Sequence, residues 1–387
     1  MSLLGTRALG IRTPIIKEGD DLVKIVADSV IDAAKMHSLE LNDNDVVCVT
    51  EAVVAIAQGN FVSIDDVAAD VARIFKGCDT VCLVHPAPLS RNRFINILKG
   101  IAKGVKKLVV IVQPVDEVGN SLLKEFNPYE VDLNLYTAAE FVKKFGKPCH
   151  KFTGIDYLEA YQAAGDNIEM YVSASPVHAT KLSENVIAGT IHTKEQLKNY
   201  LIKNGAKRAI TLSDIVATKT DKHGYNEEHG VLGSNMAGDN KLKLFPRDAK
   251  KFAFDLQAEL LRLTSSKIEC MVYGDGAFKD PVGGIWELAD PVVSPGFTDG
   301  LKGTSRPEVK LKNLAAQYAH LPEKERDRLI KEAILKQADL PLNDPARLGT
   351  TPRQLPDLLG SLADLATGSG SKGTPVVLVQ DYFVSRY

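Results

Sequence analysis

The chain has 387 residues, 44% of them hydrophobic and 25% charged, which is the balance of a soluble globular enzyme and long enough for two domains. Lys and Arg number 47 and Asp and Glu 49, so the net charge is −2 and no basic excess is present to bind nucleic acid. No apolar run reaches the roughly 18 residues of a membrane span. The five cysteines, several inside apolar runs, suit a reducing compartment, and we expect a cytoplasmic protein.

Residues 9–75 predict a compact opening segment. A turn at Gly19–Asp20 precedes a helix that begins near Leu22, because apolar residues recur there at helical spacing. The β-branched run in "NDNDVVCVTEAVVAIAQG" predicts a strand that ends at Gly59, and "IDDVAADVARIF" predicts the next helix.

Residues 79–115 read as strand, helix and strand. Because the connection is a helix, the two strands are expected to be parallel. The start of that helix, with Arg91 and Arg93, is either an anion-binding site or a plain crossover with solvated arginines. An unrelated α/β enzyme with its site near His85 is a third interpretation of this segment.

A long polar segment covers residues 213–240, after alternating helices and strands. Its carboxylates and imidazoles, among them Asp214, Asp221 and His223, are either ligands for a divalent metal or groups on a solvated surface loop. Their spacing matches no closed metal-site pattern.

Two aspartates follow predicted strands beside glycines. Asp275, in "YGDGAFKDP", lies between two glycines, where a ligand can approach the backbone and a carboxylate can hold Mg²⁺. The alternative is a tight turn stabilised by the aspartate itself. Asp156, in "FTGIDY", has the same character, but it is also placed to cap the helix that follows.

The glycine-rich stretch "GSGSKGT" near the end of the chain resembles a phosphate loop only in composition. In such a loop, lysine follows the second glycine and a helix comes next. Here Lys372 precedes Gly373, and the apolar run "VVLVQ" predicts a strand. The segment is therefore not expected to bind phosphate in that way.

Four stretches together resemble the coenzyme F420-0:L-glutamate ligases, a family of γ-glutamyl ligases. They are "GIRTPIIKEGDDL", "NDNDVVCVTEAVVAIAQG", "YGDGAFKDPVGG" and "DLLGSLADLATGSGSKGTPVVLVQ", in the order seen in that family. The resemblance implies an α/β fold with mixed sheets, into which the strand–helix–strand segment is inserted. It also implies a cytoplasmic homodimer that uses GTP, or ATP, and Mg²⁺ or Mn²⁺.

Residues of this chain take family roles through the resemblance. The nucleotide-contacting turn corresponds to Thr13, Pro14, Ile15 and Ile16, and the metal-binding aspartates correspond to Asp156 and Asp275. The aspartate ahead of the final turn corresponds to Asp357. The chain departs from the family at Glu51 and Ile56, where the family has a serine and a nucleotide-binding lysine, and at Glu159, where it has asparagine.

The activity implied by the resemblance is amide formation through an acyl phosphate. The substrates are L-glutamate, a nucleotide and a cofactor carboxylate such as coenzyme F420-0 or a folate. Phosphoryl transfer of this kind needs metal ions and cationic donors. We expect Asp156 and Asp275 to hold the metals, helped by Asp214, Asp221 or Asp280. Lys279, Lys219 or Lys372 would replace the missing lysine, and Glu51 or His223 would accept a proton.

The expected organisation has an N-terminal α/β domain over residues 1–165, which carries the insertion, and a C-terminal α/β domain over residues 166–387. The changed nucleotide positions leave a second function open. In that alternative, the chain is a non-catalytic descendant of the fold that binds a metal or a small anion.

Overall fold

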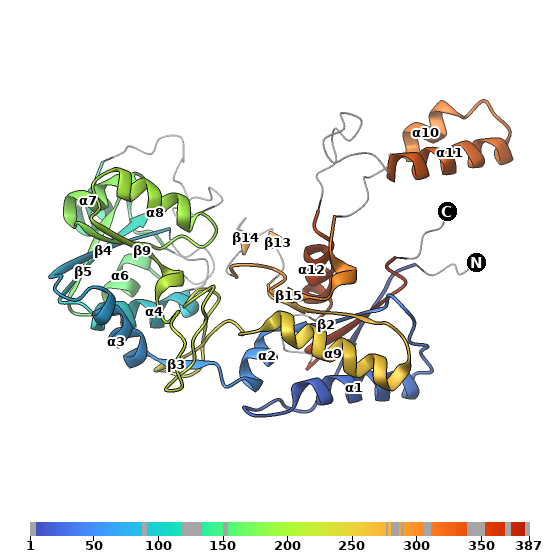
Figure 1. The fold of residues 1–387 in the computed structure, drawn as a ribbon. Coiled ribbons are helices and arrows are strands. Elements are labelled where there is room, and N and C mark those ends of the chain that lie inside the picture. Colours follow the sequence, from blue (N-terminus) through green and yellow to red (C-terminus); the bar gives the residue numbers. More distant parts are fainter. Residues whose placement is uncertain are drawn as a thin grey trace.

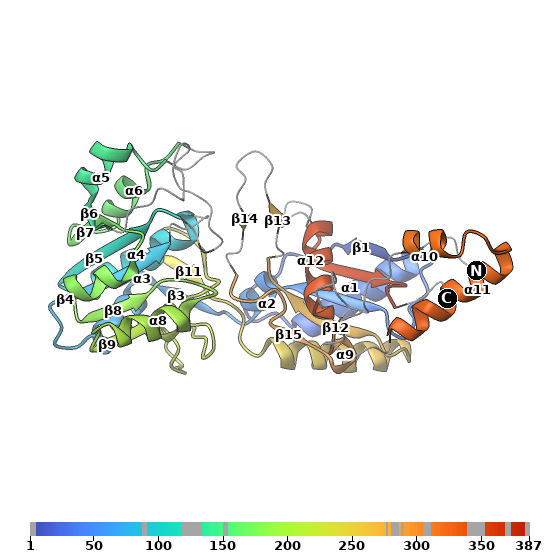
Figure 2. The same ribbon diagram turned by 90° about the horizontal axis from the view of Figure 1, so that it is seen from above.

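The chain folds into two α/β units, each built on its own sheet, in a computed structural model. Figures 1 and 2 show the two sheets side by side, with the helices α10 (Leu311–Gln317) and α11 (Glu323–Ala338) standing apart at one end. The structure describes residues 5–86, 91–115, 117, 134–149, 154–275, 278–279, 286–287, 290–304, 311–338, 353–367 and 373–383.

A five-stranded mixed sheet forms the first unit, in the order β1-β16-β2-β12-β15. Strands β2 and β12 are parallel, and the other neighbours are antiparallel. The three middle strands are buried almost throughout, as their runs of valine and other apolar residues predict for strands covered on both faces. The strands are β1 (Arg7–Ile11), β2 (Val46–Thr50), β12 (Glu269–Tyr273), β15 (Gly296–Phe297) and β16 (Val376–Gln380).

Helices cover both faces of this sheet, because alternate residues of each strand point to opposite sides. Val47 and Val49 of β2 pack with α1 (Leu22–Met36) and α9 (Ala249–Thr264). Cys48, between them, packs with α12 (Leu355–Thr367) on the other face. Figure 1 shows α1 and α9 below the sheet and α12 above it.

A six-stranded sheet forms the second unit, in the order β6-β7-β5-β4-β8-β9. All neighbours are parallel except β6 and β7. From β4 the chain adds β5 and β7 on one side and then β8 and β9 on the other side, as in a doubly wound fold. The strands are β4 (Thr80–Pro86), β5 (Lys107–Gln113), β6 (Tyr136–Thr137), β7 (Ile168–Val172), β8 (Asn185–Ala188) and β9 (Arg208–Thr211).

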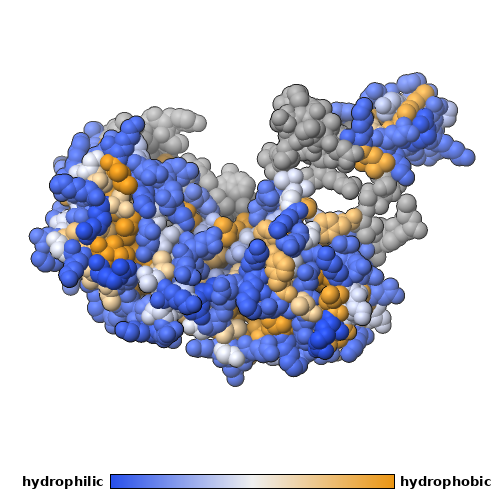
Figure 3. Space-filling view, in the orientation of Figure 1, coloured by the Kyte–Doolittle hydropathy of each residue, from blue (hydrophilic) through white to orange (hydrophobic). Residues whose placement is uncertain are grey.

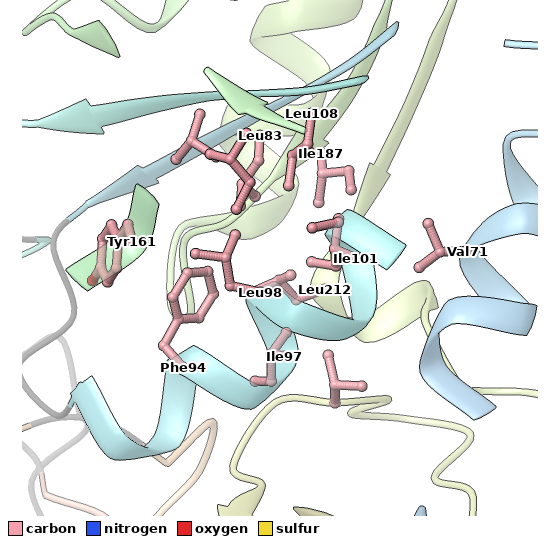
Figure 4. Packing of buried hydrophobic residues seen from close by; sticks show 14 of the residues in the cluster. Val71, Leu83, Phe94, Ile97, Leu98, Ile101, Leu108, Tyr161, Ile187 and Leu212 are labelled. Carbon is pink, nitrogen blue, oxygen red and sulfur yellow. The ribbon is translucent and has the colours of Figure 1, made fainter. Parts of the chain in front are cut away.

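The core of the second unit lies between this sheet and helices on its two faces. Leu83, Leu108 and Ile187 of the strands pack against Leu98 and Ile101 of α4 (Figure 4). The other face is covered by α7 and α8. The helices of this unit are α3 (Ile64–Ile74), α4 (Arg91–Lys103), α5 (Ala138–Phe145), α6 (Tyr157–Gln162), α7 (Ala179–Leu182) and α8 (Lys194–Lys203).

Short elements connect the two units. A three-stranded sheet in the order β10-β11-β3 follows α2 and packs against α4. Its strands are β3 (Phe61–Ser63), β10 (Asn235–Met236) and β11 (Lys241–Lys243); α2 spans Glu51–Ala57, and β13 (Phe278–Lys279) pairs with β14 (Trp286–Glu287). Single 3₁₀ turns lie at Pro176–His178, Leu212–Asp214 and Asp299–Leu301.

The mixed α/β fold and the parallel strands of the inserted segment agree with the sequence expectations. The boundary expected at residue 165 falls between β6 and β7, which are neighbours in one sheet. The strand expected to run to Gly59 ends at Thr50 instead, and α2 follows. Alanines strengthen the helical propensity of this segment, and its first residue, Glu51, carries the negative charge that a helix N-terminus favours.

The mostly hydrophilic surface and the buried cysteines agree with what the composition predicts for a globular protein. Hydrophilic side chains cover most of the face in Figure 3, and hydrophobic ones gather in small patches. Cys48, Cys82 and Cys270 are buried, and the five cysteines are free thiols. Among the described helices, none has both the length and the hydropathy to cross a membrane.

Candidate active site

Four chain segments meet at one edge of the five-stranded sheet. Thr50 and Tyr273 end the parallel strands β2 and β12 in register, so the residues that follow them lie together. Ile11 pairs with Val376 in antiparallel strands, so the residues after β1 meet those before β16 at the same edge. The topology therefore places the loops of four strands around one point.

A cavity of about 450 Å³ lies at this edge. Its described lining comes from the turn after β1, the start of α2, the end of β12, the last turns of α12, the segment before β16, and β10. The lining residues are Thr13, Pro14, Ile15, Ile16, Thr50, Glu51, Ala52, Val53, Asn235, Tyr273, Gly274, Asp275, Asp364, Thr367, Gly373, Thr374 and Pro375. The turn Thr13–Ile16, which the resemblance leads us to expect at a nucleotide, is thus brought together with Glu51 and Asp275.

Carboxylates dominate the charge of the described lining. Glu51, Asp275 and Asp364 each contribute one, and no lysine or arginine is among the lining residues that the structure describes. The backbone N–H of Asp275 donates to Asp290 Oδ2 at 2.7 Å, and Asp290 is 5% exposed. This bond fixes the turn after β12 and, with it, the position of Asp275 at the cavity.

Glu51 forms a buried ion pair with Lys243 of β11. Lys243 Nζ lies 2.7 Å from each carboxylate oxygen of Glu51, and both side chains are 7% exposed. The ammonium group therefore balances one of the three lining carboxylates. The expected role of Glu51 as proton acceptor stays a prediction, and the structure shows its carboxylate as the partner of Lys243.

Neutral hydroxyl groups form another part of the wall. Tyr273 is 2% exposed, its hydroxyl lies 3.5 Å from Thr367 Oγ1, and burial raises the pKa of the phenol, which keeps it protonated. Thr374 Oγ1 is buried and has no hydrogen-bond partner among the described residues. The Tyr273 hydroxyl donates to Thr367, which in turn donates to the Asp364 carbonyl, whereas Thr374 can donate a hydrogen bond to an oxygen-rich ligand.

The donor set at the cavity fits a hard divalent cation that a substrate completes. Carboxylate, hydroxyl and amide oxygens are the ligands that Mg²⁺ and Mn²⁺ prefer. Within the described residues, no group of three His, Cys, Asp or Glu side chains is arranged to hold a metal by itself. Mg²⁺ commonly binds one or two carboxylates, together with water and substrate phosphates, and Asp275 and Asp364 can supply that number.

Asp156 and Glu159 lie in the other unit, away from the cavity. Asp156 caps α6, because its carboxylate accepts hydrogen bonds from the backbone N–H groups of Leu158 and Glu159. Lys147 Nζ lies 3.4 Å from it, and the side chain of Glu159 is 78% exposed. The structure thus gives Asp156 the capping role and does not bring it to Asp275.

Asp214 and His223 also lie outside the cavity. The Asp214 carboxylate accepts bonds from the backbone N–H and hydroxyl of Thr211, which forms a capping box, and it lies 3.6 Å from Lys198 Nζ. His223 Nδ1 bonds the carbonyl of Gly224 at 2.6 Å. The polar segment 213–240 therefore does not form a metal cluster around these residues, and Asp221 and Lys219 on it are exposed.

Asp357 is exposed at the start of α12, whereas Asp364, later on the same helix, lines the cavity. Asn235 is another polar lining residue that the sequence did not single out, although it belongs to the segment 213–240. The pairing of β10 with β11, which places it, is not visible in the sequence. Lys372 and Asp280 lie outside the described residues, and Lys279 is described only by its backbone in β13.

The comparison with protein families assigns the chain. The family model for F420-0:Gamma-glutamyl ligase matches residues 10–381. The chain belongs to this family. The match spans both sheets, so the six-stranded unit lies within the matched region of this F420-0:gamma-glutamyl ligase family member, and the family resemblance seen in the sequence is confirmed. A search of the curated proteins found no match.

Proposed function

We propose that the chain is a nucleotide- and metal-dependent ligase that attaches L-glutamate through an amide bond to a cofactor carboxylate, with coenzyme F420-0 as the first candidate acceptor. The family supports a γ-glutamyl ligase. The observation that carries the proposal is the cavity at the sheet edge, where Asp275, Asp364 and the nucleotide turn Thr13–Ile16 meet.

The reaction proceeds in two displacements. An oxygen of the acceptor carboxylate attacks the γ-phosphorus of GTP or ATP, the bond to the β-phosphate oxygen breaks, and the nucleoside diphosphate leaves. The amine of glutamate then attacks the acyl carbon, phosphate leaves with the bonding electrons, and the amine loses a proton to solvent or phosphate. Activation of the carboxylate makes amide formation favourable.

The residues of the cavity serve positioning and charge neutralisation, which dominate phosphoryl transfer. Asp275 and Asp364 would hold a divalent cation that neutralises the phosphates. The hydroxyl of Thr374 would donate to a phosphate or carboxylate oxygen. The turn Thr13–Ile16 forms the side of the cavity that the family resemblance assigns to the nucleotide.

The test is a turnover assay with the whole chain, L-glutamate, Mg²⁺ or Mn²⁺, and GTP or ATP. Coenzyme F420-0 and a folate are offered separately, and mass spectrometry detects the gain of one glutamyl residue. The proposal expects product with F420-0 and none without nucleotide. Product with the folate and none with F420-0 would show that the acceptor is a folate. Binding of metal and nucleotide without turnover on either acceptor would overturn the ligase in favour of a non-catalytic binding protein.

A further inference from the structure

The cavity holds more negative than positive charge on the residues that the structure describes. Glu51, Asp275 and Asp364 line it. Residue 56, where the resemblance leads us to expect a nucleotide-binding lysine, is an isoleucine in this chain. A nucleoside triphosphate would bring further negative charge to this wall. If the proposed function holds, on which this inference rests, a protein cation must accompany the metal ion.

Lys243 supplies a cation beside the wall. Its Nζ makes two hydrogen bonds of 2.7 Å, both to Glu51, whose side chain lines the cavity. An ammonium group has three donors, and among the described residues only Glu51 is bonded to the Lys243 ammonium, through two of them. The charge thus lies one hydrogen bond from the cavity wall, and its third donor has no partner within the described part of the chain.

Two elements hold this ammonium group in place. Glu51 is the first residue of α2, directly after β2, and so is fixed by the edge of the five-stranded sheet. Lys243 is the cross-strand partner of Asn235, which also lines the cavity. Residues that neighbour Lys243 on two sides therefore face the same cavity.

A buried ion pair is not explained by stability alone. Removing two charges from water costs about as much as their attraction returns, so an apolar pair of similar size would serve the fold as well. A buried pair beside a cavity that must receive phosphate has a chemical use. Glu51 orients the ammonium group without a ligand, and the remaining donor meets the ligand.

We propose that Lys243 is the phosphate-binding cation of the cavity and that Glu51 is the positioning residue that holds it there. Lys243 thus replaces the charge that Ile56 does not provide, from a strand far away in the sequence.

The test compares nucleotide affinities of Lys243→Met and wild type by calorimetry at fixed Mg²⁺. The expected result is a loss of affinity for GTP and ATP on the order of tenfold to a hundredfold, the range for one charged hydrogen bond. Affinity for GMP and AMP, which lack the terminal phosphates, should change much less. Lys243→Arg, which keeps the charge, should recover part of the loss.

Lys241→Met is the matched control, since Lys241 lies on the same strand two residues away and is exposed. It should bind GTP and ATP as wild type does. The double variant Glu51→Gln/Lys243→Met avoids an unpaired buried carboxylate, and its fold is checked by circular dichroism. It should lose triphosphate affinity while folded, which a purely structural pair would not do.

Three results would contradict the proposal in distinguishable ways. If wild type binds neither nucleotide with Mg²⁺ or Mn²⁺, the proposed function itself fails, and with it the role of Lys243. If wild type binds and the folded double variant binds equally well, only the role of Lys243 is overturned. An equal loss for the monophosphates and triphosphates would also overturn it, because the effect would not follow the phosphates.

Discussion

Asp364 and Asp357 are two aspartates of α12, seven residues apart, with different surroundings. Asp364 lines the cavity, and Asp357 is exposed at the first turn. We predict that Asp364→Asn weakens Mg²⁺-dependent binding of GTP or ATP by tenfold or more, because a charged ligand becomes a neutral one. Calorimetric titration with and without the metal measures the effect.

The control for this prediction is Asp357→Asn, which removes the same charge from the same helix. It should leave the metal-dependent affinity within about twofold of wild type, since the effect of an exposed charge is small. Equal losses for the two variants would show a general effect of the charge on α12 and would contradict a site at Asp364.

His85 is a buried histidine of the six-stranded unit, and its surroundings shift its pKa. Its side chain is 3% exposed and stacks on Phe94, and its Nδ1 donates to the Gly189 carbonyl at 2.9 Å. Burial lowers the pKa of His85 from 6.5 to about 3, although that hydrogen bond opposes the shift. The folded protein therefore favours the neutral ring.

The lowered pKa of His85 predicts a loss of stability in acid. Its contribution is complete above pH 6.5 and falls between pH 6.5 and about 3, by about 1.4 kcal/mol for each pH unit, because the unfolded chain binds the proton. We expect His85→Phe to be less stable at pH 7 but to lose stability less steeply between pH 6.5 and 4.5. Urea unfolding across this range measures both slopes.

The control for His85→Phe is His37→Phe, which replaces an exposed histidine just after α1. Its slope should match that of wild type. If His85→Phe keeps the wild-type slope as well, another group causes the acid sensitivity; His229 is the first candidate, since burial lowers its pKa too.

At the scale of elements, Asp156 illustrates how one sequence pattern fits two roles. Its carboxylate caps α6 and is 10% exposed. We predict that Asp156→Ala lowers the free energy of unfolding by about 1 kcal/mol, the usual value of an N-cap, and leaves Mg²⁺-dependent nucleotide affinity unchanged. Denaturant unfolding and calorimetry measure the two effects.

A conservative exchange sharpens the test of Asp156. Asp156→Asn retains a capping oxygen and removes the charge, so it should recover most of the stability lost in Asp156→Ala. If either variant loses metal-dependent nucleotide binding while it remains folded, Asp156 would be a metal ligand and the capping interpretation would be insufficient.

Helices and strands that follow from local residue patterns can be predicted from the sequence. Contacts between segments far apart in the sequence cannot. The periodicity from Leu22 predicts α1, and the run "VVLVQ" predicts β16. The valines of the segment from Glu51 favour a strand, yet its alanines and its place after β2 make it a helix. Asn235 and Lys243 join the site only through the pairing of β10 with β11, which short-range patterns cannot specify.

At the scale of the whole molecule, two cores lie on two separate sheets. Val47, Val49 and Leu378 belong to a core of the five-stranded sheet, and Leu83 and Leu108 belong to one of the six-stranded sheet. Short elements such as α2 and the β3–β11 pair join them. Separate cores commonly unfold as separate cooperative units.

This architecture predicts that a ligand of the cavity stabilises one unit selectively. At a nucleotide concentration of 100 times Kd with Mg²⁺, the stabilisation is about 2.7 kcal/mol, which slows exchange through unfolding about a hundredfold. We expect that slowing for the amides of β2, β12 and β16, whose loops form the cavity, and little change for β4, β5 and β7. Hydrogen exchange with mass spectrometry measures each group. Equal slowing in both sheets would instead show that the ion pair of Glu51 with Lys243 and the sheet β10-β11-β3 couple the two cores into one cooperative unit.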